Sequence, residues 1–155
     1  MTVKEKAEFK KRLYEKCIDI IEQRITESLH AMNNSQAAAN AEEKSSAGDK
    51  YETSRAMSHL EKDMHAKQLE ANRKELSVLL NTGCNRQYKS AAAGSIVQCT
   101  GMSFFIIAGL GKINFEDKIV FLLSPYAPMA RSLFNKKNGS KFIFNKKEEL
   151  ITDIF

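Results

Sequence analysis

Apolar residues in the first part of the chain recur at steps of three and four positions, the spacing that places them on one side of an α-helix. They are Phe9, Leu13, Cys17, Ile20, Ile21, Ile25, Leu29 and Met32, with charged residues between them. We predict a helix over residues 4–44, because the alanines after Ser35 favour helix although the residues directly before them do not. A disordered loop over residues 33–48 is the alternative.

A second helix is predicted from Asp49 to Leu80, but its apolar positions change phase midway. Met57, Leu60 and Met64 form one stretch, and Leu69, Leu76 and Leu80 form another. Neither helix can bury its apolar side alone, and only the short segment SSAG separates the two. We therefore predict a long antiparallel coiled-coil hairpin over residues 1–80.

This hairpin predicts an elongated monomer, because each arm spans roughly 45 to 60 Å at the rise of an α-helix. We expect small-angle X-ray scattering to show such a particle at all protein concentrations. A compact sphere of 17.5 kDa would contradict the hairpin.

Beyond residue 94 the period changes to two, and β-branched and aromatic residues dominate. The predicted strands are SIVQC (95–99), FFIIA (104–108), KIVFLL (118–123), KFIF (141–144) and ELITDIF (149–155). A short helix is predicted within residues 124–139, with Pro128 in its first turn. The fold class is α+β: the hairpin, a linker over 81–93, and a small antiparallel β domain over 94–155 that carries one helix.

Charge divides the chain near the same place. Residues 1–80 hold 14 Lys and Arg against 14 Asp and Glu, whereas residues 81–155 hold 10 against 5. The net charge of +5 therefore lies in the second part. A basic surface favours an acidic partner, either nucleic acid or an acidic protein face, and an ordinary solvated surface is the other explanation.

Cysteine usage and hydropathy indicate a soluble cytoplasmic protein that needs no membrane. The three cysteines are odd in number and lack C-x-x-C spacing, so neither a disulfide framework nor a zinc ribbon is expected. The first residues have no apolar core that would make a signal peptide. The longest apolar run, FFIIAGL, is too short to span a bilayer.

Several segments together resemble the Gre family of bacterial transcript-cleavage factors. That family has a strand opening Gly-Ser-x-Val, a strand ending Ser-Pro, an Ala-x-x-Leu-x-x-Lys helix, and a Gly turn before a Phe-containing strand. The matching residues are Gly94 to Val97, Ser124, Pro125, Ala130, Leu133, Lys136 or Lys137, Gly139 and Phe142. Between the two helices, Gly48-Asp49-Lys50-Tyr51-Glu52 matches the family's Gly-Asp-x-x-Glu tip.

The resemblance implies an FKBP-like C-terminal domain and a partner, bacterial RNA polymerase. In this family the C-terminal domain docks outside the secondary channel and the coiled coil passes down it. Asp49 and Glu52 would then help to hold a Mg²⁺ ion at the polymerase active site, where a backtracked transcript is cut. The protein would be no enzyme by itself, would meet the RNA only indirectly, and would dock through Ser124, Pro125, Ala130, Leu133, Lys136 and Lys137.

Departures from the family pattern keep other interpretations open. The family tip continues Glu-Asn-Ala-Glu-Tyr, whereas this chain continues Glu52-Thr53-Ser54-Arg55-Ala56, and Lys50 stands between the two acids. A Gre-like regulator that occupies the channel without promoting cleavage is one alternative. A coiled-coil adaptor for an unrelated partner is another. Locally, Asp-x-x-Glu is also a helix-capping pattern, and both roles can coexist.

Overall fold

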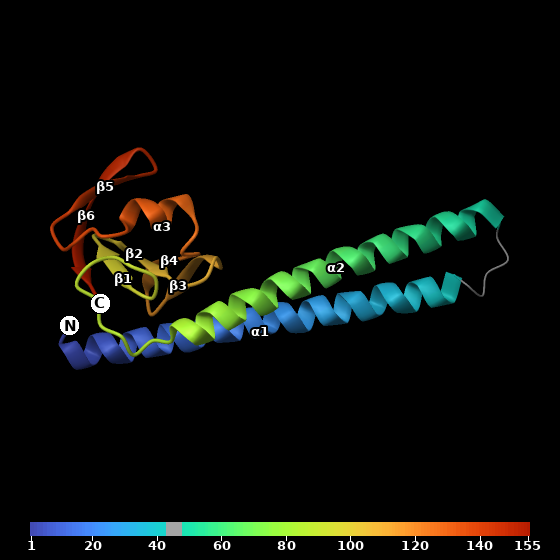
Figure 1. Cartoon of the computed structure of the whole chain (residues 1–155), viewed down its shortest axis with the longest axis horizontal. Coiled ribbons are helices and arrows are strands. Elements are labelled where there is room, and N and C mark those ends of the chain that lie inside the picture. The colour runs from blue at the N-terminus through green and yellow to red at the C-terminus, as the bar shows by residue number, and fades with distance from the viewer. Residues whose placement is uncertain (43–47) are drawn as a thin grey trace. The chain divides into compact units, whose positions relative to one another are not determined.

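The computed structural model describes residues 1–42 and 48–155 (Figure 1). The elements are α1 (Val3–Glu42), α2 (Gly48–Thr82), β1 (Ile96–Cys99), β2 (Met102–Ile106), β3 (Gly111–Phe115), β4 (Lys118–Leu123), α3 (Pro128–Leu133), β5 (Lys141–Phe144) and β6 (Lys147–Ile154). Contacts divide the chain into two compact units. Unit 1 consists of Met1–Ile20 with Glu75–Phe155, and unit 2 of Ile21–Lys74.

The first helix begins with reciprocal hydrogen bonds between Thr2 and Glu5, a capping box. The backbone N–H of Glu5 donates to Thr2 Oγ1 (3.2 Å), and the backbone N–H of Thr2 donates to Glu5 Oε2 (2.6 Å). These hydrogen bonds lower the pKa of Glu5. The helix continues to Glu42, so residues 33–42 are helical and the alternative of a loop there is wrong. The predicted helix end at Lys44 and the turn over 45–47 lie outside the described residues.

The two long helices pair in antiparallel fashion within each unit. In unit 1 the Tyr14 hydroxyl donates to the Leu79 carbonyl (3.1 Å), and in unit 2 Lys62 Nζ donates to Gln36 Oε1 (2.5 Å). As the position on α1 increases, the partner position on α2 decreases. The predicted core role of Cys17 is confirmed, since its side chain is buried and burial raises the pKa of its thiol to about 12.

The predicted packing side of α2 is wrong in its first half. Met57, Leu60 and Met64 are 55%, 63% and 50% exposed. At the other end of the helix the prediction of Leu80 is also wrong, because Leu80 is 55% exposed and Leu79 is buried instead. The less exposed residues instead repeat at steps of four and three, the heptad spacing of paired helices: Ser58, Lys62, His65, Leu69, Asn72, Leu76 and Leu79. On α1 the buried residues beyond Ile25 are small, namely Ser28, Ser35 and Ala39. Small residues leave no deep apolar core between the helices there, so polar side chains can occupy the facing positions of α2.

The second part of the chain forms a six-stranded mixed sheet in the order β3-β4-β2-β1-β6-β5. Four neighbouring pairs are antiparallel, but β2 and β4 are parallel, which corrects the prediction of a purely antiparallel sheet. The sequence prediction also missed β3, which pairs with β4 as a hairpin. Its two turn residues, Glu116 and Asp117, both have positive φ, as a tight hairpin turn requires.

Both faces of the sheet are covered within unit 1. On one face, α3 packs Ala130 and Leu133 against a cluster that contains Val97, Phe104 and Ile106. On the other face Ile96 and Phe105 are fully buried. The first turns of α1 contact β3, the turn after it, and β6. The Phe9 and Phe115 rings lie 5.6 Å apart, Arg12 Nε lies 2.6 Å from Glu116 Oε1, and Lys6 Nζ lies 2.5 Å from Asp153 Oδ2.

Candidate functional site

The hairpin tip, residues 48–52, carries the two predicted metal-assisting acids at the start of α2. The backbone of Asp49 lies in the first turn of this helix, and Glu52 follows three residues later. Residues at this spacing lie on the same side of a helix, so their carboxylates can reach one ion or its bound waters. Glu52 is exposed. The Asp49 side chain, and with it the capping interpretation, lies outside what the structure describes.

The donor chemistry of the tip fits a shared magnesium ion better than one held by this chain alone. Magnesium takes oxygen ligands, keeps several waters, and is commonly bound through one or two carboxylates together with groups of a substrate. Two acids therefore provide part of such a site. Across residues 1–42 and 48–155, no group of three or more His, Cys, Asp or Glu side chains is placed to hold a metal ion.

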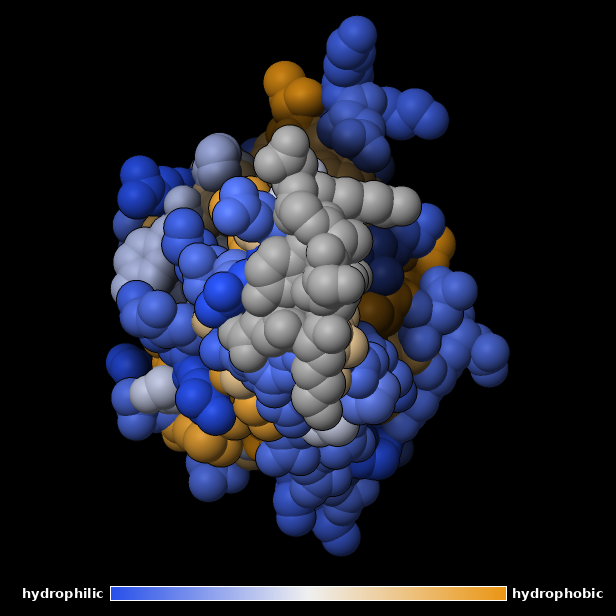
Figure 2. Space-filling model, turned by 90° about the vertical axis from the view of Figure 1, so that its right-hand side faces the viewer, coloured by the Kyte–Doolittle hydropathy of each residue, from blue (hydrophilic) through white to orange (hydrophobic). Residues whose placement is uncertain are grey.

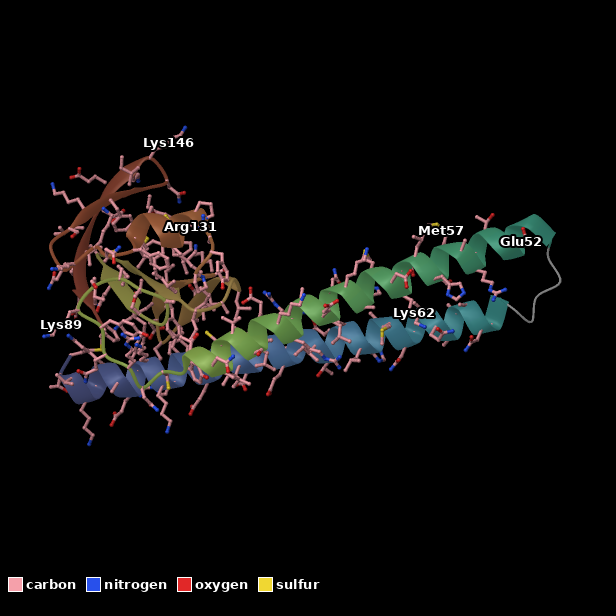
Figure 3. All side chains as sticks on the ribbon, viewed as in Figure 1. Glu52, Met57, Lys62, Lys89, Arg131 and Lys146 are labelled. Atoms are coloured by element: carbon pink, nitrogen blue, oxygen red, sulfur yellow. The ribbon has the colours of Figure 1, made fainter. Side chains whose placement is uncertain are left out.

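An uncovered apolar surface follows the tip along α2. It consists of Met57, Leu60 and Met64, defined from here on as the α2 apolar stripe. Figure 3 shows Met57 pointing away from α1, whereas Lys62 lies on the α1 side. The molecular face in Figure 2 is mostly hydrophilic, with separate hydrophobic areas between the polar residues. The change of phase in the α2 pattern was the sequence signal that could have identified this stripe as a surface.

The predicted docking segment forms the turn into α3. Ser124 Oγ accepts a hydrogen bond from the Tyr126 N–H (3.2 Å), and the Ser124 carbonyl accepts one from the Ala127 N–H (3.0 Å). Pro128 then occupies the first turn of the helix, as predicted. Ser124 and Pro125 are half-buried. The Ser-Pro pair therefore shapes a turn and also keeps part of its surface accessible.

Two of the predicted docking residues are part of the core. Ala130 and Leu133 are both 0% exposed, so their side chains hold α3 on the sheet and offer no contact surface. Lys136 is half-buried and Lys137 is exposed. The backbone of Lys136 is fixed as well, because its carbonyl accepts a hydrogen bond from the Ala91 N–H (2.8 Å).

Exposed residues of the same segment were missed by the sequence analysis. Tyr126 is 73% exposed, and Arg131 projects from the outer side of α3 (Figure 3). These two belong to a continuous stretch, residues 118–147, that contains no Asp or Glu. Its basic residues are Lys118, Arg131, Lys136, Lys137, Lys141, Lys146 and Lys147. Lys141 is paired with Glu148 (2.7 Å), so this charge is balanced within the chain. Arg131 on α3 and Lys137 shortly after it are exposed, and these two residues are called the basic surface around α3 from here on.

The Gly-Ser pair before β1 has a structural explanation. Gly94 has φ of +89°, and a side chain there would collide with the Tyr88 hydroxyl. Ser95 is fully buried, and its hydroxyl donates to the Ala92 carbonyl (2.7 Å) and accepts from the Ala92 N–H (3.0 Å). The pair therefore closes the chain against the sheet.

Comparison with known proteins gives no match, so the functional interpretation of this chain rests on its geometry. No protein-family model matches the chain, and no significant match exists among curated proteins or solved structures. None of the helices α1, α2 and α3, over the residues that the structure describes, combines the length and the apolar character needed to cross a membrane. Two features remain for a functional interpretation: the acidic hairpin tip and the basic surface around α3.

Proposed function

We propose that this protein is a Gre-like transcription elongation factor with an FKBP-like C-terminal domain. It binds RNA polymerase at the secondary channel in the bacterial cytoplasm and promotes cleavage of backtracked transcripts. The observation that carries the proposal is that two chemistries belong to two different units of the chain. Unit 1 contains the beginning of α1, the end of α2 and the basic surface, whereas the acids Asp49 and Glu52 belong to unit 2.

The tip residues act by presenting carboxylate oxygens to a site that the polymerase completes. Asp49 and Glu52 lie one helical turn apart and supply two of the oxygen ligands that magnesium prefers. A magnesium ion bound there would supply the activation of water and the stabilisation of the leaving oxygen. Because this chain supplies only part of the ligand set, cleavage is an activity of the polymerase that the protein stimulates.

Docking of the β domain uses the basic surface around α3. Residues 118–147 carry positive charge without an acid, which suits an acidic face of the polymerase. Tyr126 and Arg131 are the strongest contact candidates, because exposed Tyr and Arg residues are the types most often found at interface hot spots. The buried Ala130 and Leu133 contribute by fixing the position of α3.

The α2 apolar stripe supports insertion of the hairpin into a channel. Met57, Leu60 and Met64 are exposed on the side of α2 that does not face α1, within a few turns of Glu52. A helix cap alone gives no reason for an apolar surface there. Contact with a channel wall would remove these three side chains from water, which is favourable by roughly 25 cal/mol per Å² of apolar surface.

The docking proposal predicts that charge reversal beside α3 weakens polymerase binding. In the full chain, Arg131→Glu combined with Lys137→Glu should raise the Kd for core polymerase about tenfold or more at low salt, because each reversal replaces attraction by repulsion. The difference should shrink as salt rises. Fluorescence anisotropy of a labelled chain across a salt series measures both effects.

The matched control reverses the same number of charges elsewhere. Lys16→Glu with Lys112→Glu changes two exposed lysines of unit 1 that lie outside residues 124–147, and its affinity should stay within about twofold of the wild type. If both variants weakened polymerase binding equally, binding would depend on the net charge of the chain and not on the residues beside α3. Absence of any binding by the wild type would favour the adaptor interpretation.

A further inference from the structure

A cavity of about 340 Å³ lies within unit 1, between the first turns of α1 and residues 84–87, and the C-terminal Phe155 forms part of its wall. This volume falls within the range of natural small-molecule sites. The end of α1 itself is already capped by Thr2 and Glu5, so the cavity is distinct from a bare helix terminus. None of the residues proposed to contact the polymerase lines it.

The wall of this cavity is strongly basic. Its charged residues are Lys4, Lys6, Lys10, Lys11, Arg86 and one acid, Glu8. Lys4 and Lys6 have carboxylates nearby, since Lys4 Nζ lies 4.0 Å from Glu8 and Lys6 Nζ lies 2.5 Å from Asp153. Among the residues that the structure describes, Lys10, Lys11 and Arg86 form no ion pair. These three residues therefore bring positive charge to a wall in which the one lining Glu, Glu8, lies beside Lys4.

Lys10 is the most unusual of these residues because it is only 3% exposed. Its Nζ donates to the Arg86 carbonyl (2.9 Å) and lies 4.4 Å from the centroid of the Tyr88 ring. Both partners are uncharged groups, although each interacts favourably with a cation. Burial lowers the pKa of Lys10 to about 8, as expected for a desolvated ammonium group without a carboxylate partner. An anion in the cavity would balance this charge.

We propose that the cavity binds a small phosphate monoester with an apolar organic group. The phosphate would face Lys10, Lys11 and Arg86, whose guanidinium can hold two phosphate oxygens at once. A phosphate monoester carries up to two negative charges near neutral pH and so suits a site with several cations. The organic group would contact Val3, Ala7 and the Phe155 ring, the apolar part of the wall.

Titration of the full-length protein with phenyl phosphate, inorganic phosphate and phenol tests this proposal. Calorimetry should show saturable binding of one phenyl phosphate, about tenfold tighter than inorganic phosphate because the ring adds apolar contact. Phenol should show no binding. In NMR spectra the shifted amides should be those of residues 3–11, 84–87 and 155. Equal affinity for both phosphates, or shifts spread over lysines elsewhere, would overturn the proposal.

Variants of the wall separate a built site from general attraction to positive charge. Arg86→Gln should weaken phenyl phosphate binding about tenfold or more, since it removes a charged hydrogen-bond donor. Lys146→Gln removes an equal charge from an exposed turn outside the cavity and should leave the affinity unchanged. Should Arg86→Gln disturb the fold, Lys11→Gln provides the same test at an exposed position. Unchanged affinity in a folded Arg86→Gln or Lys11→Gln variant would refute the assigned phosphate contacts.

Discussion

Replacement of Asp49 by Asn and Glu52 by Gln should abolish stimulated transcript cleavage while polymerase binding persists. Amide groups are neutral and bind magnesium poorly, so the shared site would lose two ligands. Loss of residues that merely orient metal ligands commonly costs 10–100-fold in activity, and loss of the ligands should cost about 100-fold or more. Cleavage of the RNA in stalled, backtracked elongation complexes measures the rate, and anisotropy measures binding.

This double replacement also separates catalysis from helix capping. Asn caps a helix about as well as Asp, so the free energy of unfolding of the hairpin should fall by no more than about 1 kcal/mol. The matched control is Glu61→Gln with Asp63→Asn, which neutralises two exposed acids further along α2. That control should cleave at the rate of the wild type.

Two outcomes of the cleavage assay would change the interpretation of the tip. A double variant as active as a stimulating wild type would remove the metal role from Asp49 and Glu52. A wild type that binds but never stimulates would favour the regulator without cleavage activity. In that case Thr53, Arg55 and Ala56, which replace the Asn, acid and aromatic of the family tip, are the first residues to restore.

The two long helices were predictable because one signal extends over many residues. The apolar period of α1 runs from Phe9 to Met32, and the helix continues through the weak helix formers after it to Glu42. The packing side of α2 was not predictable from hydropathy alone, because Ser58, Lys62 and His65 occupy its facing positions opposite small residues of α1. A rule that places every apolar residue between the helices assigns Met57 to the side of α2 that faces α1, whereas Met57 is exposed.

The sheet illustrates a second limit of local sequence. The strands that form its buried centre are short apolar runs, and these were found. Strand β3 was missed because it lies at an edge of the sheet, where Lys112 and Asn114 are exposed. The parallel pairing of β2 with β4 depends on how distant segments meet, which no local period encodes.

The residues of the candidate docking surface were also only partly predictable from the local sequence. Residue identity alone selected Ala130 and Leu133, yet the short helix turns these two inward and leaves Arg131 and Ser132 outside. The amphipathic pattern of this helix could have separated the core residues from the contact residues. The exposure of Tyr126 follows from the turn that Ser124 forms, and only the structure reveals it.

Replacement of Phe104 by Ala should cost the β domain about 3–5 kcal/mol of unfolding free energy. Phe104 is 0% exposed and lies at the centre of an aromatic cluster. Its ring centroid lies 5.3 Å from that of Phe121, 5.7 Å from Phe142 and 5.2 Å from Phe144. The variant loses buried apolar surface and leaves a cavity among three rings that belong to two other strands, β4 and β5. Since small domains are stable by only about 5–15 kcal/mol, much of the margin would be lost.

Urea unfolding followed by near-ultraviolet circular dichroism measures this loss, because the aromatic signal reports side-chain packing. The aromatic residues of the domain include Phe104, Phe105, Phe121, Phe142 and Phe144. The far-ultraviolet signal is followed in parallel, since the two units can unfold separately. Ile143→Ala is the matched control on β5: its side chain is 72% exposed, so its cost should stay within about 0.5 kcal/mol. Equal costs for both variants would mean that Phe104 is not the centre of the core.

A folded Phe104→Ala protein should also bind polymerase more weakly, because α3 packs on the same cluster through Leu133 and would no longer hold Arg131 in a fixed position.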